Sequence, residues 1–368
     1  MENWYQLNNA DELDSPALIV FPERIKENIR VLKSFVPDTT RLRPHVKTNK
    51  CPEVCQLMID AGIKKFKCAT IAEAEMLAMI GVTDVLLAYQ PIGPRGIRFC
   101  QLIKKYPKTQ FSCLLDNEAT ASELSATAEK HDIQIKVFLD LNVGMNRTGI
   151  VPKKALPLFL HCQSLKGITP IGLHAYDGHH NNTDLSIRTK GCDEGFARVE
   201  ALQTEIAKQT GITPTIVTGG NTTLSIHAKR KNAECSPGTF IFWDYGYHKL
   251  FAELHFVFAA ILVTRIISKP TEETICIDLG HKAVASENIL INRVHFLNAP
   301  ELQPLGHSEE HLILKAEKNN SYKVGDVLYG VPFHICPTVA LHETVAVAEN
   351  NRITGSWNIV ARKRKISV

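Results

Sequence analysis

The sequence has few aromatic residues and almost no excess of either charge. Aromatic residues make up 7% of the 368 positions, and 42 Lys and Arg against 38 Asp and Glu give a net charge of +4. A balance this even argues against nucleic acid as a partner, because nucleic-acid-binding domains concentrate Lys and Arg. The one dense basic cluster, Arg362–Lys365, is expected to be a solvated tail.

Long apolar runs and targeting segments are also missing. The most apolar window, Phe251–Ile267, is interrupted by Glu253 and Arg265, so it predicts buried strands rather than a membrane span. The first residues contain no basic stretch followed by an apolar one, and the ten cysteines have no disulfide-framework spacing. We therefore expect a cytoplasmic protein with reduced thiols and no membrane contact.

Strand-like runs recur between residues 41 and 243, and most are followed by an amphipathic helical stretch. Several runs are continuously apolar, as expected for parallel strands covered by helices. Eight such units in roughly 200 residues match a (β/α)8 barrel; a doubly wound sheet is the alternative, but no GxGxxG follows the first strand. The predicted strands are Arg41–Lys47, Lys65–Ala69, Asp84–Tyr89, Gln110–Leu115, Gln134–Leu141, Thr169–Tyr176, Thr213–Thr218 and Cys235–Trp243.

After about residue 246 the pattern changes to short strand-like pieces separated by turns, which predicts an all-β domain. The expected fold class is therefore α/β, a (β/α)8 TIM-like barrel followed by a C-terminal all-β domain. The barrel is expected over residues 18–246 and the β-rich domain over residues 247–368, with residues 1–17 packing on the latter. The predicted pieces are Phe256–Ile267, Glu273–Leu279, Ala283–Ala285, His311–Ala316, Asp326–Val331 and Thr344–Ala348.

The end of the first predicted strand carries a candidate nucleophile. In such barrels, catalytic groups come from the carboxyl ends of the strands. Period-2 alternation places Arg43, His45 and Lys47 on one face, so Lys47 is expected at the barrel mouth among basic groups. Nearby positive charge lowers the pKa of an amine and makes it a better nucleophile toward an aldehyde. The alternative is an ordinary surface lysine.

The end of the seventh predicted strand has the composition of an anion-binding turn. In these barrels phosphate often binds after strands 7 and 8. Glycine lets backbone N–H groups approach an anion, and threonine hydroxyls add donors. A Gly-Gly turn by itself is usually only a turn, but its place at the phosphate position of a barrel that also carries an inward lysine favours phosphate binding. The candidate residues are Thr218, Gly219, Gly220, Asn221 and Thr222.

Two further loops supply candidate polar groups. Arg147, after the fifth predicted strand, and Tyr176, at the end of the sixth, are candidate contacts to the ring oxygen or phosphate of a cofactor. His179 and His180 are candidate bases, although loop histidines are more often solvated than catalytic.

The β-rich part contains one pattern that suggests a metal site. If residues 334–336 form a strand, His334 and Cys336 face the same side, and imidazole and thiolate converge on one point. Such a pair could supply half of a zinc site that keeps positions open for water or substrate. An isolated His-x-Cys is often accidental, and two ligands are too few for a closed structural site.

Motifs spread over nearly the whole chain resemble one enzyme family. They are Arg43-Pro-His-Val-Lys47-Thr-x-Lys50, Asn142-x-Gly-x-x-Arg147-x-Gly149, Gly172-Leu-His-Ala-Tyr176-x-Gly178, Thr218-Gly219-Gly220 and Val331-Pro-x-His334-x-x-Pro337-Thr338. Together these are similar to the D-threonine aldolase and D-serine dehydratase family. Its members are pyridoxal-phosphate enzymes of fold type III, with an alanine-racemase-like barrel and β domain.

The resemblance implies a role for each candidate residue. Lys47 would bind pyridoxal phosphate covalently, the Thr218–Thr222 loop would hold its phosphate, and His45, Arg147 and Tyr176 would complete the cofactor site. His334 and Cys336 would hold a divalent metal near the β-hydroxyl of the substrate. The soft thiolate favours zinc, with manganese and magnesium as alternatives. Family members act as homodimers.

The resemblance also implies an activity and leaves alternatives. The expected reaction is cleavage of a D-3-hydroxy amino acid, D-threonine giving glycine and acetaldehyde. At position 336 the aldolases tend to carry aspartate and the dehydratase-like members cysteine, so Cys336 resembles the dehydratases. The main alternative is therefore a D-serine dehydratase, which gives pyruvate and ammonia. Near the place of the aldolases' basic histidine lie Asn181 and Asn182, so His179, His180 or a metal-bound hydroxide must serve instead. A racemase needs no metal, and a non-catalytic pyridoxal-phosphate protein has little use for the β domain.

Overall fold

The computed structural model describes residues 3–368, and its contacts divide the chain into two compact units. The barrel unit comprises residues 32–47, 55–238 and 363–368; the β unit comprises residues up to 31, 48–54 and 239–362. The predicted domain boundary at residue 246 stays a prediction. Among the helices in the described part of the chain, none has both the length and the hydropathy needed to cross a membrane.

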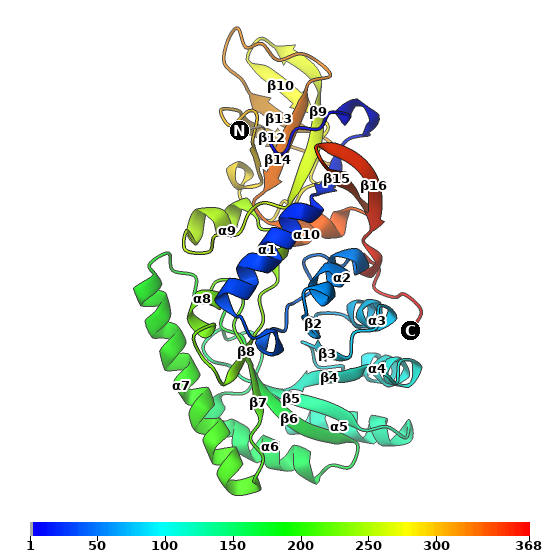
Figure 1. The fold of residues 1–368 in the computed structure, drawn as a ribbon, viewed down its shortest axis with the longest axis vertical. Coiled ribbons are helices and arrows are strands. Elements are labelled where there is room, and N and C mark those ends of the chain that lie inside the picture. Colours follow the sequence, from blue (N-terminus) through cyan, green and yellow to red (C-terminus); the bar gives the residue numbers. More distant parts are fainter. Residues whose placement is uncertain (1–2) are drawn as a thin grey trace. The chain divides into compact units, whose positions relative to one another are not determined.

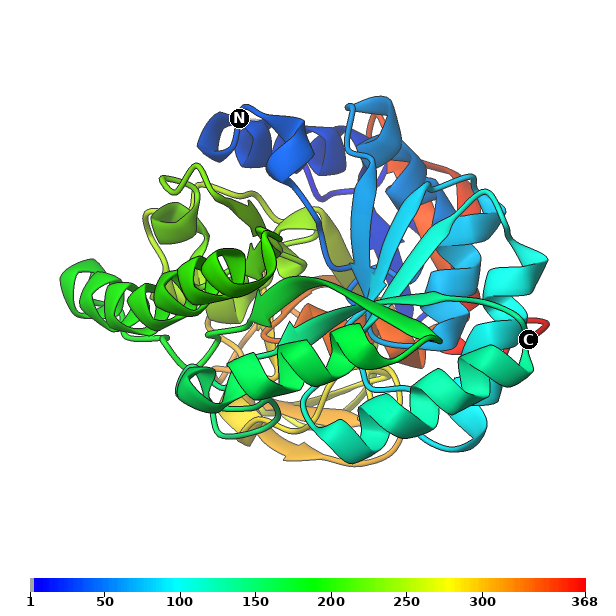
Figure 2. The same cartoon turned by 90° about the horizontal axis from the view of Figure 1, so that it is seen from below.

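The barrel unit is built on seven parallel strands whose order in the sheet follows their order in the chain (Figure 1). Helices lie along the outer side of the curled sheet (Figure 2), which explains the continuous apolar runs in several strands, such as residues 85–87 and 137–139. The strands are β2 (Lys65–Cys68), β3 (Asp84–Leu87), β4 (Gln110–Leu115), β5 (Ile135–Asp140), β6 (Ile168–Ala175), β7 (Thr215–Thr218) and β8 (Ala233–Cys235).

A short segment occupies the eighth place and joins the two edges of this sheet. Leu42 pairs in parallel with Cys235 of β8, and His45 pairs in parallel with Lys67 of β2. The Pro44 carbonyl accepts a hydrogen bond from the Lys67 backbone N–H at 2.8 Å. The predicted first strand is thereby reduced to two isolated bridges, because proline has no N–H to donate to a ladder. The barrel architecture of the prediction is confirmed.

The last predicted strand of the barrel is misplaced. β8 begins at Ala233, two residues before the predicted start, and ends at Cys235. Pro237 and Gly238 follow, and the chain then turns through a 3-10 helix, Thr239–Ile241, where the prediction expected strand. The apolar run after Gly238 is buried as a helical turn, which periodicity alone does not distinguish from a buried strand.

Some helices of the barrel unit begin at residues whose side chains accept hydrogen bonds from the first backbone N–H groups. Thr70, Asn117 and Asp184 each accept such a bond. Gly211, with φ of +74°, ends the longest helix in the left-handed conformation that favours glycine. The helices are α3 (Ile71–Met79), α4 (Pro94–Lys105), α5 (Glu118–Lys130), α6 (Ala155–Ser164), α7 (Leu185–Thr210) and α8 (Leu224–His227); α1 (Pro22–Phe35) and α2 (Pro52–Asp60) run across the division between the units.

The β unit is a mostly antiparallel sheet that includes the early strand β1 (Ala17–Val20), paired with β9 and β15. The prediction missed β11, β12 and β16, which are short or mostly polar, and the expected strand Ala283–Ala285 is a turn. The elements are β9 (Ala260–Thr271), β10 (Thr274–Ile277), β11 (Val294–Phe296), β12 (Gln303–His307), β13 (Leu312–Lys315), β14 (Val327–Pro332), β15 (Thr344–Glu349), β16 (Arg352–Asn358), α9 (Tyr245–Leu250) and α10 (Ile335–Leu341).

A buried charge cluster fixes the closing segment inside the barrel unit. The Arg43 side chain is 2% exposed and donates to Asp84 Oδ1 and Glu234 Oε2, each at 2.6 Å. The guanidinium therefore links the closing segment to β3 and β8. Removing one partner of such a pair is costly, because the remaining charge is left in a low-dielectric interior.

Arg43→Met is expected to lower the free energy of unfolding by about 3–5 kcal/mol, because Asp84 loses its cation and Glu234 keeps only its pair with Lys65. Urea unfolding of the variant and the native protein measures the difference. Arg30→Met, which removes an exposed pair with Glu27, is the matched control and should change little. Equal effects of the two substitutions would contradict the assignment.

Candidate functional site

A cavity of about 550 Å³ opens in the barrel unit among the residues that end its strands. Its size suits a small cofactor together with a substrate. The predicted residues His45, Lys47, Arg147 and Tyr176 all line it. The sequence therefore brings together four side chains from three strand ends, as the barrel rule requires.

Basic and aromatic side chains line this cavity. Lys47 is exposed, and its backbone N–H donates to His45 Nδ1 at 3.2 Å, which fixes the imidazole next to the lysine. The Arg147 guanidinium lies 5.2 Å from the centre of the Tyr176 ring. This is within the range of a cation–π contact, so the two side chains support each other at one wall.

A second lysine, which the sequence analysis missed, also lines the cavity. Lys67 of β2 is fully buried, and its Nζ lies 3.4 Å from His174 Nε2. Burial and then the charge of Lys47 lower the pKa of Lys67 to about 7. The signal was available in the sequence: Lys67 stands between Phe66 and Cys68 in a run that was predicted to be a covered parallel strand.

Behind Lys67 lies a buried imidazole–carboxylate pair. His174 Nδ1 lies 2.7 Å from Asp140 Oδ1. Burial is the largest influence and would raise the pKa of Asp140, but the contacts with His174, Thr148 and Lys67 together hold that pKa below its usual range. Burial, and then Lys67, lowers the pKa of His174. The carboxylate can only accept, so Nδ1 carries the imidazole proton and the Nε2 lone pair faces Lys67.

The predicted glycine turn after β7 has the features of an anion cradle. Gly219 has φ of +73°, and a Cβ at Gly220 would lie 3.0 Å from Tyr176 Cε2. Thr222 Oγ1 is buried without a hydrogen-bond partner in the described structure. A buried hydroxyl of this kind is costly unless a ligand satisfies it, so the turn fits a phosphate group.

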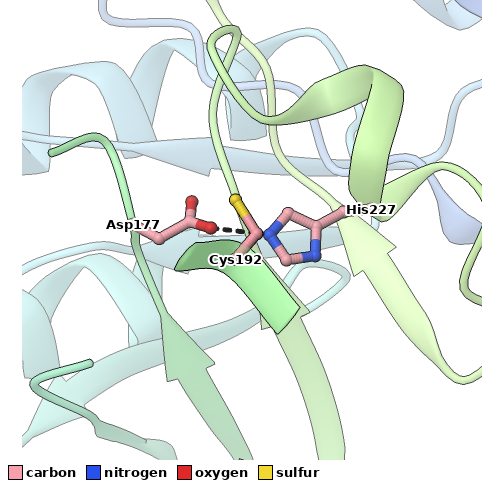
Figure 3. Close-up of side chains that lie close together, drawn as sticks. All are labelled: Asp177, Cys192 and His227. Atoms are coloured by element: carbon pink, nitrogen blue, oxygen red, sulfur yellow. Dashed lines mark hydrogen bonds and ion pairs between the residues drawn. The ribbon is translucent and has the colours of Figure 1, made fainter. Parts of the chain in front are cut away.

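A buried cluster of Asp177, Cys192 and His227 supports this turn (Figure 3). His227 Nε2 lies 2.7 Å from Asp177 Oδ2, and Asp177 Oδ1 accepts from Thr223 Oγ1 at 2.8 Å. Thr223 Oγ1 in turn accepts from the Gly220 backbone N–H at 3.3 Å. The cluster therefore ties the turn to the loop after β6.

Among the described residues, this cluster is the one group of three potential metal ligands whose ligand atoms lie within 4.8 Å of one another. Its hydrogen bonds nevertheless occupy the atoms that a metal would need. Arg230 Nε donates to His227 Nδ1 at 3.0 Å, which leaves Nε2 to donate to Asp177. Burial, and then Asp177, raises the pKa of the Cys192 thiol. A thiol that stays protonated is a poor metal ligand, so the chemistry of this cluster favours a structural role over metal binding.

The predicted bases His179 and His180 lie outside the residues that line the cavity. Their rings are 3.9 Å apart, and a Cβ at Gly144 would lie 2.7 Å from His179 Nε2. His180 lines a small void of about 10 Å³ beside Asp177 and Cys192. Burial, and then His180, lowers the pKa of His179. Their assignment as bases stays a prediction.

The predicted metal ligands His334 and Cys336 lie in the β unit, where they contact each other. The expectation that they lie in a strand is wrong: His334 is the N-cap of α10, and Cys336 is in its first turn. Pro337 is tolerated there, because the first turn of a helix needs no N–H donor. The two side chains therefore come together because they lie at the start of a helix, and not because they share one face of a strand.

Polar groups surround this pair. His334 Nδ1 lies 2.5 Å from Glu287 Oε1, while Thr48 Oγ1 and Thr239 Oγ1 lie 3.1 and 3.4 Å from Cys336 Sγ. Burial alone would lower the pKa of His334, but the contacts with Cys336 and Glu287 raise it to about 9. Because the Glu287 carboxylate engages Nδ1, Nε2 is the ring atom of His334 that could bind a metal.

The curled parallel sheet with a lysine-bearing cavity at its strand ends has the architecture of a barrel enzyme. Residues 20–246 match the family model described as alanine racemase, N-terminal domain, and the chain belongs to that family. Residues 259–348 match a model described as putative serine dehydratase domain.

Proteins similar to this chain over nearly its full length carry lyase names. It is 26% identical to a D-threonine aldolase of Arthrobacter sp, over 95% of this chain and 93% of the relative. It is 25% identical to a 3-hydroxy-D-aspartate aldolase of Paracoccus denitrificans, over 96% and 93% of the two chains. The crystal structure of D-threonine aldolase from Filomicrobium marinum shares the fold, with a TM-score of 0.87 at 22% identity over 95% and 96% of the two chains.

The burial of Lys67 predicts a pH-dependent stability. Its pKa falls from 10.5 to about 7 on folding, so between these values the unfolded chain binds more protons and stability rises with pH. Relative to Lys67→Met, the free energy of unfolding of the native protein without cofactor should rise by roughly 1.4 kcal/mol per pH unit in this window. Urea unfolding across the window measures it, and parallel curves for the two proteins would exclude the burial effect.

Proposed function

We propose that this protein is a pyridoxal-phosphate-dependent lyase that cleaves D-3-hydroxy amino acids, with D-threonine giving glycine and acetaldehyde. Pyridoxal phosphate is the cofactor expected for the alanine-racemase-like family, and lyase names are shared by relatives that span nearly the whole chain. Two observations carry the proposal: Lys47 lines the cavity, and in the glycine turn the buried Thr222 hydroxyl has no hydrogen-bond partner in the described structure.

Pyridoxal phosphate, when bound, supplies an acceptor for the electron pair of a bond broken at the α-carbon of an amino acid. Lys47 would hold the cofactor covalently. The Thr222 hydroxyl and the N–H groups of the Thr218–Thr222 turn, including that of Asn221, would bind its phosphate. His45, Arg147 and Tyr176 would line the ring site, with the guanidinium directed at an anionic oxygen.

The aldolase assignment also uses the β unit. His334 and Cys336 would bind a divalent metal, with Glu287 fixing the imidazole through Nδ1. The thiolate favours zinc over manganese or magnesium. A metal there would act as a Lewis acid on the β-oxygen of the substrate. We also propose that the enzyme acts as a homodimer in the cytoplasm.

D-Serine dehydratase activity is the second candidate function. It is favoured by the match of residues 259–348 to a putative serine dehydratase domain and by a thiol at position 336. Both activities need the same lysine and cofactor, so the products have to distinguish them. Acetaldehyde and glycine from D-threonine support the aldolase, whereas a keto acid and ammonia from D-serine or D-threonine support the dehydratase.

Lys47→Ala should abolish both the cofactor absorbance and turnover, because the covalent attachment is lost. Product assays on D-threonine and D-serine, with pyridoxal phosphate and Zn²⁺ or Mn²⁺, measure turnover, and absorbance spectra measure attachment. Lys64→Ala, at an exposed lysine, is the control and should retain both. An unchanged absorbance spectrum of Lys47→Ala would refute the assignment of Lys47 as the residue that binds the cofactor.

Cys336→Ala should leave the cofactor absorbance in place and remove metal-dependent turnover, because one of two protein ligands is lost. Metal content by atomic absorption should fall together with activity. Cys276→Ala, at the other half-buried cysteine, is the control and should keep its metal. Full activity of the native protein in the presence of a chelator would refute the metal role.

A further inference from the structure

The barrel-unit cavity contains more acid–base machinery than the proposed cofactor site uses. Cleavage of a D-3-hydroxy amino acid requires a base for the proton of the β-hydroxyl. The loop histidines do not line the cavity, whereas Lys67 and His174 do. The candidates for this base are therefore the titratable groups of the cavity wall.

We propose that Lys67, held by His174 and Asp140, is the residue that accepts the β-hydroxyl proton of the bound D-3-hydroxy amino acid. The inference rests on the proposed function and deepens it, because it names the proton acceptor of that reaction. Geometry supports it: Lys67 lines the cavity, its Nζ lies 3.4 Å from His174 Nε2, and His174 Nδ1 lies 2.7 Å from Asp140 Oδ1.

The direction of these hydrogen bonds leaves Lys67 able to accept a proton. His174 Nε2 presents a lone pair, so one N–H of Lys67 donates to it. The lone pair of an uncharged amine is then available to the cavity. After it accepts a proton, the ammonium still donates to His174, and the Asp140 carboxylate lies behind that imidazole. The relay therefore stabilises the charged form at the moment when it arises.

The charged groups around Lys67 keep its two forms close in free energy. Lys47 and Arg43 oppose the ammonium, while Asp140 and Asp177 favour it, and burial disfavours it most. A lysine in this balance has a pKa near 7, which is the range in which a general base works best at neutral pH. The ring of Tyr176, 5.7 Å from Nζ, adds a further contact to the cation.

Protons and electrons balance in the proposed cleavage step. The proton leaves the β-oxygen for Lys67 Nζ, the Cα–Cβ bond breaks, and the β-carbon becomes the carbonyl carbon of the aldehyde. The electron pair of the broken bond remains with the α-carbon, and the proton is later returned to that carbon in glycine. Lys67 thus ends each turnover uncharged, with no net uptake of protons.

The first test follows the ionisation of Lys67 without any turnover. In protein labelled with ¹³C-lysine and free of cofactor, one ¹³Cε signal should titrate near pH 7. That signal should be missing from Lys67→Met and present in Lys64→Met, the matched control at an exposed position on the approach to β2. If every lysine titrates near 10.5, the inference is overturned.

The second test measures the pH profile of the loaded enzyme. Lys67→Met and Lys67→Arg should retain the cofactor absorbance, which confirms folding, but lose roughly 10²–10⁴-fold in kcat. The acidic limb of kcat/KM should disappear from the residual activity, and added methylamine should partly rescue a Lys67→Ala variant. Native turnover together with an unchanged profile in Lys67→Met refutes the inference alone. No aldehyde from D-threonine or other D-3-hydroxy amino acids with the native enzyme instead refutes the proposed function.

Discussion

The barrel unit depends on the hydrogen bonds by which one short segment joins its two sheet edges. Leu42 and His45 make single bridges to β8 and β2, and the buried Arg43 is held between Asp84 and Glu234. A closed sheet has no edge left to pair with another chain. Because the segment is pinned on both sides, Lys47 follows it into the cavity at a defined position, and Pro44 prevents the segment from extending further as a regular strand.

The chemistry of the cavity follows from how the protein handles positive charge. Lys47 and Arg147 both line the cavity, and Lys67 is buried in its wall. Such an arrangement is unfavourable for folding, but it would suit the proposed site, in which an anionic cofactor binds and protons move. Asp140 and Asp177 lie within electrostatic reach of Lys67, and each is already engaged by a histidine. The carboxylates therefore moderate the charge without neutralising the lysines.

Much of this arrangement could be predicted from the sequence. β4 has the predicted bounds, and the residues assigned to the cofactor ring line one cavity, because strand alternation and the barrel rule together determine which side chains meet. Lys67 was missed although its strand was predicted, since it lies before the strand end where functional residues were sought. His334 and Cys336 converge for a different reason than expected, because the start of α10 depends on capping and on Pro337. Period-2 reasoning cannot anticipate a helix that begins between two candidate ligands.

The cluster behind the glycine turn has a consequence for ligand affinity. Asp177, Thr223 and His227 hold the turn through contacts made entirely within the barrel unit. The conformational entropy of ordering this loop is thus lost during folding rather than at the moment when a phosphate arrives. A preorganised cradle recognises the phosphate group itself, whatever is attached to it. If this turn holds the cofactor phosphate as proposed, simple phosphate esters would compete with the cofactor, and the phosphate concentration would help to determine how much of the protein is loaded.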